Sequence, residues 1–208
     1  IIKSSDIMRA KSPLEAIKNI KSIHPYIELP AFILLGLCSG LVAVMLMKSL
    51  FWGEDIGNAF QNLTGIKRWL RPALAGILLG GLAIWFPHIV GVGYETISNA
   101  LTGQILLHEA IVFAILKVLA VSITVGGRMG GGVFSPSLMI GALIGLAFGW
   151  IATSIFPTLS GAQTLYALAG MGAVSAAVLG APISTTLIVF ELTGDWQTGL
   201  AVMVAVSF

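Results

Sequence analysis

The second half of this chain carries almost no charge, and that limits what it can fold into more than any other feature. Between residues 111 and 208 the only charged side chains are Lys117, Arg128, Glu191 and Asp195. Over the whole sequence charged residues make up 10% and mean hydropathy is +0.98, whereas a typical soluble domain is about 25% charged. A water-soluble fold could not cover its surface with so few charges, so the sequence predicts an integral membrane protein. The net charge of +2, without a basic stripe, predicts no nucleic-acid partner.

Apolar runs of helical length follow one another along the chain. A transmembrane helix needs about 20 mainly apolar residues, and four segments reach or approach that length: 29–52, 69–90, 108–125 and 133–156. Three further runs are shorter: 165–179, 182–192 and 198–208. Short apolar runs interrupted by Gly and Pro are typical of discontinuous helices, which border binding sites in transporters. The predicted fold class is all-α, with tilted and discontinuous membrane helices.

Residues 1–26 have a different composition and form a basic, polar lead-in to the apolar region. Lys and Arg outnumber the acidic Asp6 and Glu15 there, and the few apolar residues are spaced as on one face of a helix. This pattern fits a solvated loop or an amphipathic helix at the membrane interface. We therefore predict a boundary at residue 26, with the membrane domain over 27–208.

The run GGRMGGGVFSP at residues 126–136 interrupts the apolar pattern. Glycine has no Cβ and tolerates positive φ, so such a loop lets backbone amides approach a ligand closely. Ser135 and Pro136 are typical of a helix N-cap and first helical position. A helix N-terminus offers unpaired N–H groups and a partial positive charge to an anion. Irregular backbone at membrane depth is tolerated only where it lines a cavity or is buried, so the segment predicts an anion site inside the membrane.

Residues 132–136, Gly-Val-Phe-Ser-Pro, resemble the G-x-F-x-P motif of the CLC family of chloride channels and proton/chloride exchangers. Other segments resemble the same family in the same order. They are 28–30, 35–37 and 69–74 (the family's J and K helices), 91–97 and 101–103 (its L region), and 169–173, 181–182 and 190–194 (its O and P helices). The resemblance covers residues 27–208.

The resemblance implies a CLC-type inverted-repeat fold of which this chain has the second repeat only. The first-half motifs G-S-G-I-P and G-[KR]-E-G-P do not occur in the sequence. We therefore expect the missing N-terminal half of the subunit as a partner, and no transport by this chain alone. The family also implies a homodimer, here through residues 183–190 and 201–206, in a lipid bilayer. Compact loops without regulatory domains favour a bacterial inner membrane.

The resemblance also assigns the anion site. The main-chain N–H groups of Val133 and Phe134 would hold chloride, and Gly131 and Gly132 would permit its approach. Neutral donors suit conduction, because a full cation would bind chloride too tightly for exit. Chloride is the transported substrate, and no cofactor or metal is expected. Whether the protein is a channel or a proton-coupled exchanger stays open, because the deciding glutamates belong to the first half.

Two cations near this segment have alternative interpretations. Arg128 could line an aqueous entrance and attract chloride, or extend to the membrane interface. Lys117 lies inside the span 108–125, where a charge suggests a functional role. It could face the pore or pair with a carboxylate at Glu95, Glu109 or Glu191.

Other features have simpler interpretations. The lone Cys38 suits a small buried apolar position. Regularly spaced glycines suit close helix packing; these are 36/40, 76/80, 141/145/149 and 172/180. A membrane enzyme using Ser175 and His108 is disfavoured because no G-x-S-x-G or H-E-x-x-H motif occurs, so we expect no enzyme. The main alternative to chloride transport is a non-conducting, glycine-packed structural subunit.

Overall fold

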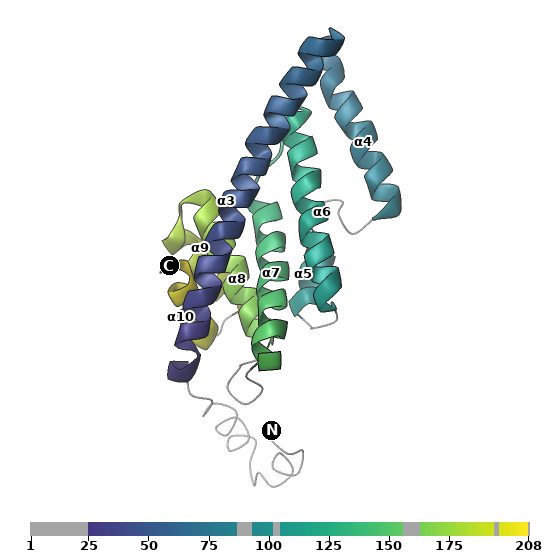
Figure 1. Cartoon of the computed structure of the whole chain (residues 1–208). Helices are drawn as coiled ribbons and strands as arrows, with labels where there is room; N and C mark the ends of the chain where they lie inside the picture. Colours follow the sequence, from purple (N-terminus) through teal and green to yellow (C-terminus); the bar gives the residue numbers. More distant parts are fainter. Residues whose placement is uncertain (1–24, 87–92, 102–104, 156–162, 194–195, 208) are drawn as a thin grey trace.

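The computed structural model describes residues 25–86, 93–101, 105–155, 163–193 and 196–207 (Figure 1). Within these ranges every regular element is helical, which confirms the all-α prediction. The elements are α3 (Pro25–Thr64), a 3₁₀ turn η1 (Arg68–Leu70), α4 (Arg71–Trp85), α5 (Tyr94–Leu101), α6 (Leu107–Gly126), α7 (Phe134–Ile155), α8 (Gln163–Leu179), α9 (Pro182–Thr193) and α10 (Trp196–Ser207). Residues 1–24 of the predicted lead-in lie outside the described residues.

Most helix bounds agree with the apolar runs, but α3 does not. It has 40 residues and continues past Trp52, the predicted end of the first span. Its later part contains Gly53 and Gly57, which are poor helix formers. Both lie against α6, where an added Cβ would meet main-chain oxygens of Ser122 and Gly126. The close contact with α6 therefore offsets the weak helix propensity of this part of α3.

Helix α8 occupies the centre of the fold. Every residue from Tyr166 to Ala176 is buried, as expected for a helix that is apolar on all sides. Helices α3, α7, α9 and α10 surround it (Figure 1). The closest crossing is with α7, where Gly141 and Gly145 lie against the α8 backbone at Gly170 and Tyr166. This pair forms the rigid support on which the start of α7 is held.

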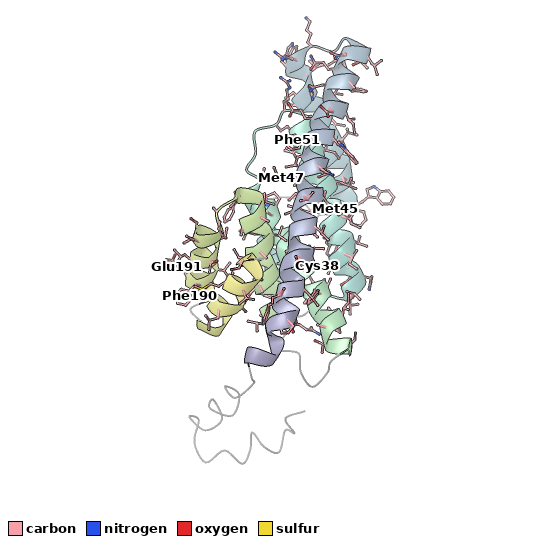
Figure 2. The ribbon with its side chains drawn as sticks, turned by 60° about the vertical axis from the view of Figure 1, so that its left-hand side comes forward. Cys38, Met45, Met47, Phe51, Phe190 and Glu191 are labelled. Atoms are coloured by element: carbon pink, nitrogen blue, oxygen red, sulfur yellow. The ribbon has the colours of Figure 1, made fainter. Side chains whose placement is uncertain are left out.

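One face of α3 packs inward and the other stays exposed. Leu35, Leu46 and Leu50 are buried, whereas Met45 and Phe51 point away from the other helices (Figure 2). Cys38 lies on the exposed face, so the prediction of a buried thiol is wrong for this chain. The exposed apolar face fits contact with lipid or with another part of a membrane protein. Among the residues that the structure describes, three helical segments are long and apolar enough to cross a membrane: 30–64, 107–126 and 134–154.

The two segments expected at a subunit interface differ in exposure. On α9, Ile183 and Leu187 are 76% and 57% exposed. On α10, Ala201, Val202 and Ala205 are buried, because α10 packs on α3, α8 and α9. Half of residues 201–206 is therefore buried inside this chain and Met203 is exposed, so the subunit interface stays a prediction.

Not all the regularly spaced glycines pack as expected. Gly36 lies against Ala205 of α10 and Gly172 against Val202. In contrast, no described atom lies within 4 Å of an added Cβ at Gly40, Gly76, Gly80 or Gly180. Gly180 instead adopts a left-handed φ of 64° where α8 ends, a typical use of glycine.

Candidate anion site

The loop toward α7 starts from a tightly bonded end of α6. The Arg128 N–H donates to Val125 O at 2.9 Å and the Met129 N–H to Thr124 O at 3.0 Å. These two bonds form a Schellman motif, which normally has glycine at its left-handed position. Here that residue is Arg128, with φ of 56°. The left-handed turn is therefore made by Arg128, and none of the neighbouring glycines 126, 127 and 130–132 has a left-handed φ.

The glycines of residues 130–132 leave open space beside the backbone. All three glycines are among the described residues, and none of them has a left-handed φ. No described atom lies within 4 Å of an added Cβ at Gly130 or Gly132, and at Gly131 only Thr124 Cγ2 does, at 3.8 Å. These glycines therefore keep one side of the loop clear rather than allow close helix packing.

Helix α7 begins two residues earlier than the Ser135 N-cap and Pro136 first position predict. Phe134 is its first residue, and the Ser137 N–H donates to Val133 O at 3.1 Å. Val133 therefore holds the N-cap position, and Ser135 and Pro136 lie in the first turn. The first N–H groups of a helix have no partner within it, so this start still provides main-chain donors. The buried Ser137 hydroxyl lies 3.4 Å from that of Ser175, which links the first turn of α7 to α8.

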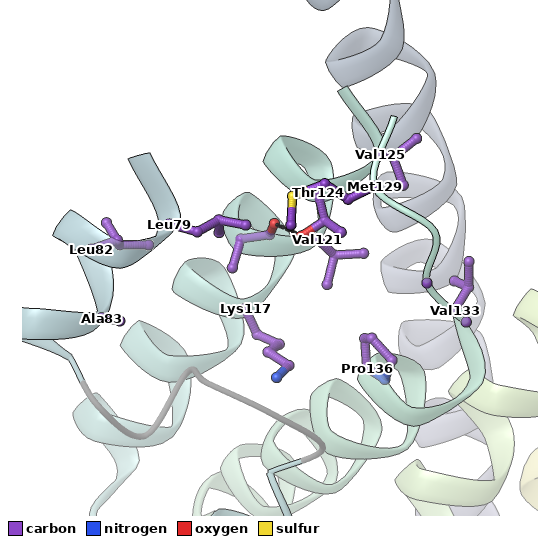
Figure 3. A pocket seen from close by; sticks show the side chains of 13 residues that line it. Leu79, Leu82, Ala83, Lys117, Val121, Thr124, Val125, Met129, Val133 and Pro136 are labelled. Atoms are coloured by element: carbon purple, nitrogen blue, oxygen red, sulfur yellow. Dashed lines mark hydrogen bonds between the residues drawn. The ribbon is translucent and has the colours of Figure 1, made fainter. Parts of the chain in front are cut away.

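A cavity of about 240 Å³ opens beside this helix start (Figure 3). Gly131, Gly132 and Val133 form one side of it, together with Pro136. Lys117 of α6 extends into it from the opposite side (Figure 3) and is only 3% exposed. The remaining wall is mainly apolar. It consists of Leu79, Leu82 and Ala83 of α4, Ala120, Val121, Thr124 and Val125 of α6, and Met129.

The structure brings some of the predicted site residues together and leaves others apart. Gly131, Gly132, Val133 and Lys117 share the cavity. Phe134 is half-buried at the first position of α7 and does not line it. Arg128 is exposed outside the cavity, and its Nη2 lies 3.4 Å from Asn58 Oδ1.

Two of the three carboxylates suggested as partners of Lys117, Glu109 and Glu191, have other positions, while a pairing with Glu95 stays a prediction. Glu109 accepts a bond from the Leu106 N–H at 3.1 Å and so caps the start of α6. It is two turns from Lys117, or about 12 Å along the helix. Glu191 is exposed near the end of α9. The arrangement therefore favours a cavity-facing role for Lys117 over pairing with these two carboxylates.

In the described residues, Ser175 and His108 do not form the catalytic pair that the enzyme hypothesis requires. Ser175 is buried and donates to Met171 O at 2.7 Å, whereas His108 is exposed in the first turn of α6. No cluster of three or more His, Cys, Asp or Glu side chains suited to a metal occurs in the part of the chain that the structure describes.

Sequence reasoning missed two contributors to this region. The first is α4, which supplies Leu79, Leu82 and Ala83 to the cavity wall although nothing in its apolar pattern marks them. The second is Arg71, whose buried guanidinium bonds to the end of α6. An arginine at the start of an apolar helix is unusual, and this was the signal in the sequence that could have identified Arg71.

A helical membrane protein with short helices and a glycine-lined cavity at a helix start has the features of an ion transporter. The profile of the voltage-gated chloride channel family matches residues 5–208. The chain belongs to this family.

Similar proteins come from bacteria and plants. The chain is 32% identical to a ClcB-like protein of Ralstonia nicotianae, over 86% of this chain and 41% of that protein. It is also 32% identical to the H⁺/Cl⁻ exchange transporter ClcA of Vibrio parahaemolyticus, over 83% of this chain and 37% of that protein. Chloride channel protein CLC-f of Arabidopsis thaliana is 32% identical over 86% of this chain and 24% of its own length.

The fold is also similar to part of a solved structure. The crystal structure of a slow cyanobacterial Cl⁻/H⁺ antiporter superposes with a TM-score of 0.74 at 26% identity, covering 86% of this chain and 42% of that one. The sequence thus spans less than half the length of these relatives, which agrees with the prediction of one repeat of a two-repeat fold.

Proposed function

We propose that this chain contributes the anion site to a transmembrane chloride transporter, either a channel or a proton-coupled exchanger. The observation that carries the proposal is the cavity in which the start of α7 faces Lys117. The main-chain N–H group of Val133, which lines the cavity, and that of Phe134, the next residue and the first of α7, hold the anion, and Gly131 and Gly132 leave it room. The names of the relatives, which include both an H⁺/Cl⁻ exchanger and a chloride channel, support chloride as the substrate.

Lys117 adds long-range attraction to these neutral donors. Its ammonium group lines a mainly apolar cavity, where a charge acts more strongly than in water. An anion that enters therefore meets a favourable potential before it reaches the helix start. Arg128 does not line the cavity, so its contribution is to the field at an entrance.

The test removes one N–H at a time from the complete protein. Replacing residue 133 or 134 by its α-hydroxy acid turns the amide into an ester and leaves the side chain intact. A hydrogen bond to a charged group contributes about 1.5–3 kcal/mol, so each ester weakens chloride binding by about tenfold or more. The readouts are calorimetric chloride binding and chloride efflux from liposomes.

An ester at Gly130 is the matched control, because this residue belongs to the same loop but precedes the helix start and is not one of the proposed donors. It should leave chloride binding unchanged. Normal chloride binding and flux with esters at both 133 and 134 would refute the site. Absence of chloride binding in the unmodified protein would instead favour a non-conducting structural subunit, which the glycine packing of α7 on α8 also fits.

The wider assembly follows from the same proposal. We infer that an N-terminal half of the same subunit covers the open side of the glycine loop, and that the described chain does not transport alone. We also infer a homodimer in a bacterial inner membrane, with contacts through the exposed residues of α9 and Met203 of α10, which is 45% exposed. Chloride is the transported ion, and the proposal includes no cofactor, metal, nucleic acid or enzymatic step.

A further inference from the structure

Arg71 is a buried cation that the proposed anion site does not use. It is the first residue of α4 and only 6% exposed. Its guanidinium reaches from α4 to both α3 and α6. It donates from Nε to Gly126 O at 2.7 Å, from Nη1 to Asn58 Oδ1 at 2.7 Å and Gln61 Oε1 at 3.2 Å, and from Nη2 to Glu54 O at 3.3 Å.

The bond to Gly126 fixes the last residue of α6. The final carbonyls of a helix lack partners within it, and the Schellman motif uses those of Thr124 and Val125. The carbonyl of Gly126 is taken by Arg71 instead. A cation also interacts favourably with the negative end of the helix dipole.

The sequence keeps space for this arrangement. An added Cβ at Gly57 of α3 would meet both Arg71 Nη2 and Gly126 O. One at Gly126 would meet Gly53 O at 2.5 Å. Glycine at these positions lets α3 and α6 approach closely enough for the guanidinium to bond to both, while α4 diverges from them (Figure 1).

The loop that follows has little support of its own. Residues 130–132 have open space beside them, as described above. Their position therefore depends on the two ends of the loop. One end is held by the packing of α7 on α8, and the other by the Arg71 contacts at the end of α6.

We propose that Arg71 is a positioning residue for the anion site. It sets the direction in which the chain leaves α6, and thereby the distance of the glycine loop from the start of α7. It acts through Gly126 and not as a charge beside the anion, because it lines a separate cavity between α3, α4 and α6. This inference rests on the proposed function.

The experiment compares Arg71→Gln and Arg71→Lys in the complete protein. A lysine keeps the charge but lacks the planar fork of donors with which Arg71 bonds to acceptors on both α3 and α6. Both variants should therefore weaken chloride binding, by about 2- to 30-fold, and change the ratio of chloride to nitrate affinity. If Arg71 acted only as a charge, Arg71→Lys would bind chloride normally.

Arg68→Gln is the matched control, since Arg68 is an exposed arginine three residues earlier. It removes the same charge and should leave chloride binding unchanged. If Arg71→Gln does not fold, Asn58→Ala removes one acceptor and keeps the bond to Gly126, and should give a smaller shift in the same direction.

The outcomes separate the two proposals. Suppose that esters at 133 and 134 weaken chloride binding, but the folded Arg71 variants, or Asn58→Ala, bind chloride normally with an unchanged ratio of chloride to nitrate affinity. The positioning role of Arg71 is then refuted, and the proposed function stands. A merely structural role gives the same normal binding with a lower melting temperature. If the esters have no effect either, the proposed anion site itself fails.

Discussion

Glycines serve opposite purposes in two regions of this molecule. Between α7 and α8, Gly141 and Gly145 lie against the backbone of the neighbouring helix, so the missing side chains allow close packing. In the loop of residues 130–132 the missing side chains face open space and a cavity. The first region provides rigidity and the second provides access. The sequence already separates them, because glycines at every fourth residue predict helix packing, whereas the glycine run at 126–136 predicts a loop.

The largest expected effect comes from filling the packed region. In Gly145→Ala the new methyl group would meet Tyr166 O and the Ala167 backbone. Because backbone cannot move aside as a flexible side chain does, we expect a loss of about 1–3 kcal/mol or more. Thermal unfolding of the complete protein in detergent measures it. Gly40→Ala is the control, since nothing described lies within 4 Å there; equal melting temperatures for the two variants would refute the packing argument.

Removing the cavity charge should have the next largest effect, on binding and not on packing. Lys117→Met keeps the length of the side chain and removes its ammonium group from the cavity. Burial strengthens electrostatic interactions, so chloride affinity should fall by about tenfold, or about 1.4 kcal/mol. Lys48→Met removes an exposed lysine from α3 and is the control. Equal chloride titrations for the two variants would show that Lys117 does not attract the anion.

A methyl group added in the open loop should weaken chloride binding without lowering the stability of the protein. In Gly132→Ala it would meet no described atom within 4 Å, so the melting temperature should barely change, within the range of about 0.5 kcal/mol typical of exposed sites. The methyl group would take space beside the helix start, so chloride binding should weaken severalfold. A large fall in melting temperature with unchanged binding would mean that this loop is packed like α7 and α8.

The sequence predicted the fold better than it predicted the site. Apolar runs gave the bounds of α6 to α9 within about two residues, because helices inside a bilayer are mainly apolar whether they face lipid or other helices. The apolar run 29–52 did not predict where α3 ends, because the last turns of this helix depend on contacts of Gly53 and Gly57 with α6. Similarly, the family resemblance marked Val133 as a site residue. The contribution of α4 arises from tertiary contacts without a local signal, and the only local sign of Arg71 is an arginine at the start of an apolar helix.

The smallest expected effect concerns the left-handed residue where the open region begins. Arg128 has φ of 56°, which costs a residue with a Cβ about 1 kcal/mol relative to glycine. The side chain of Arg128 adds little stability, since its contact with Asn58 is exposed and 3.4 Å long. Arg128→Gly should therefore raise the free energy of unfolding by up to about 1 kcal/mol and leave chloride binding unchanged. Arg128→Ala keeps the strain and should not stabilise the protein. If both variants instead lose chloride affinity equally, the guanidinium of Arg128 attracts the anion, and the access region extends outward from the cavity to the end of α6.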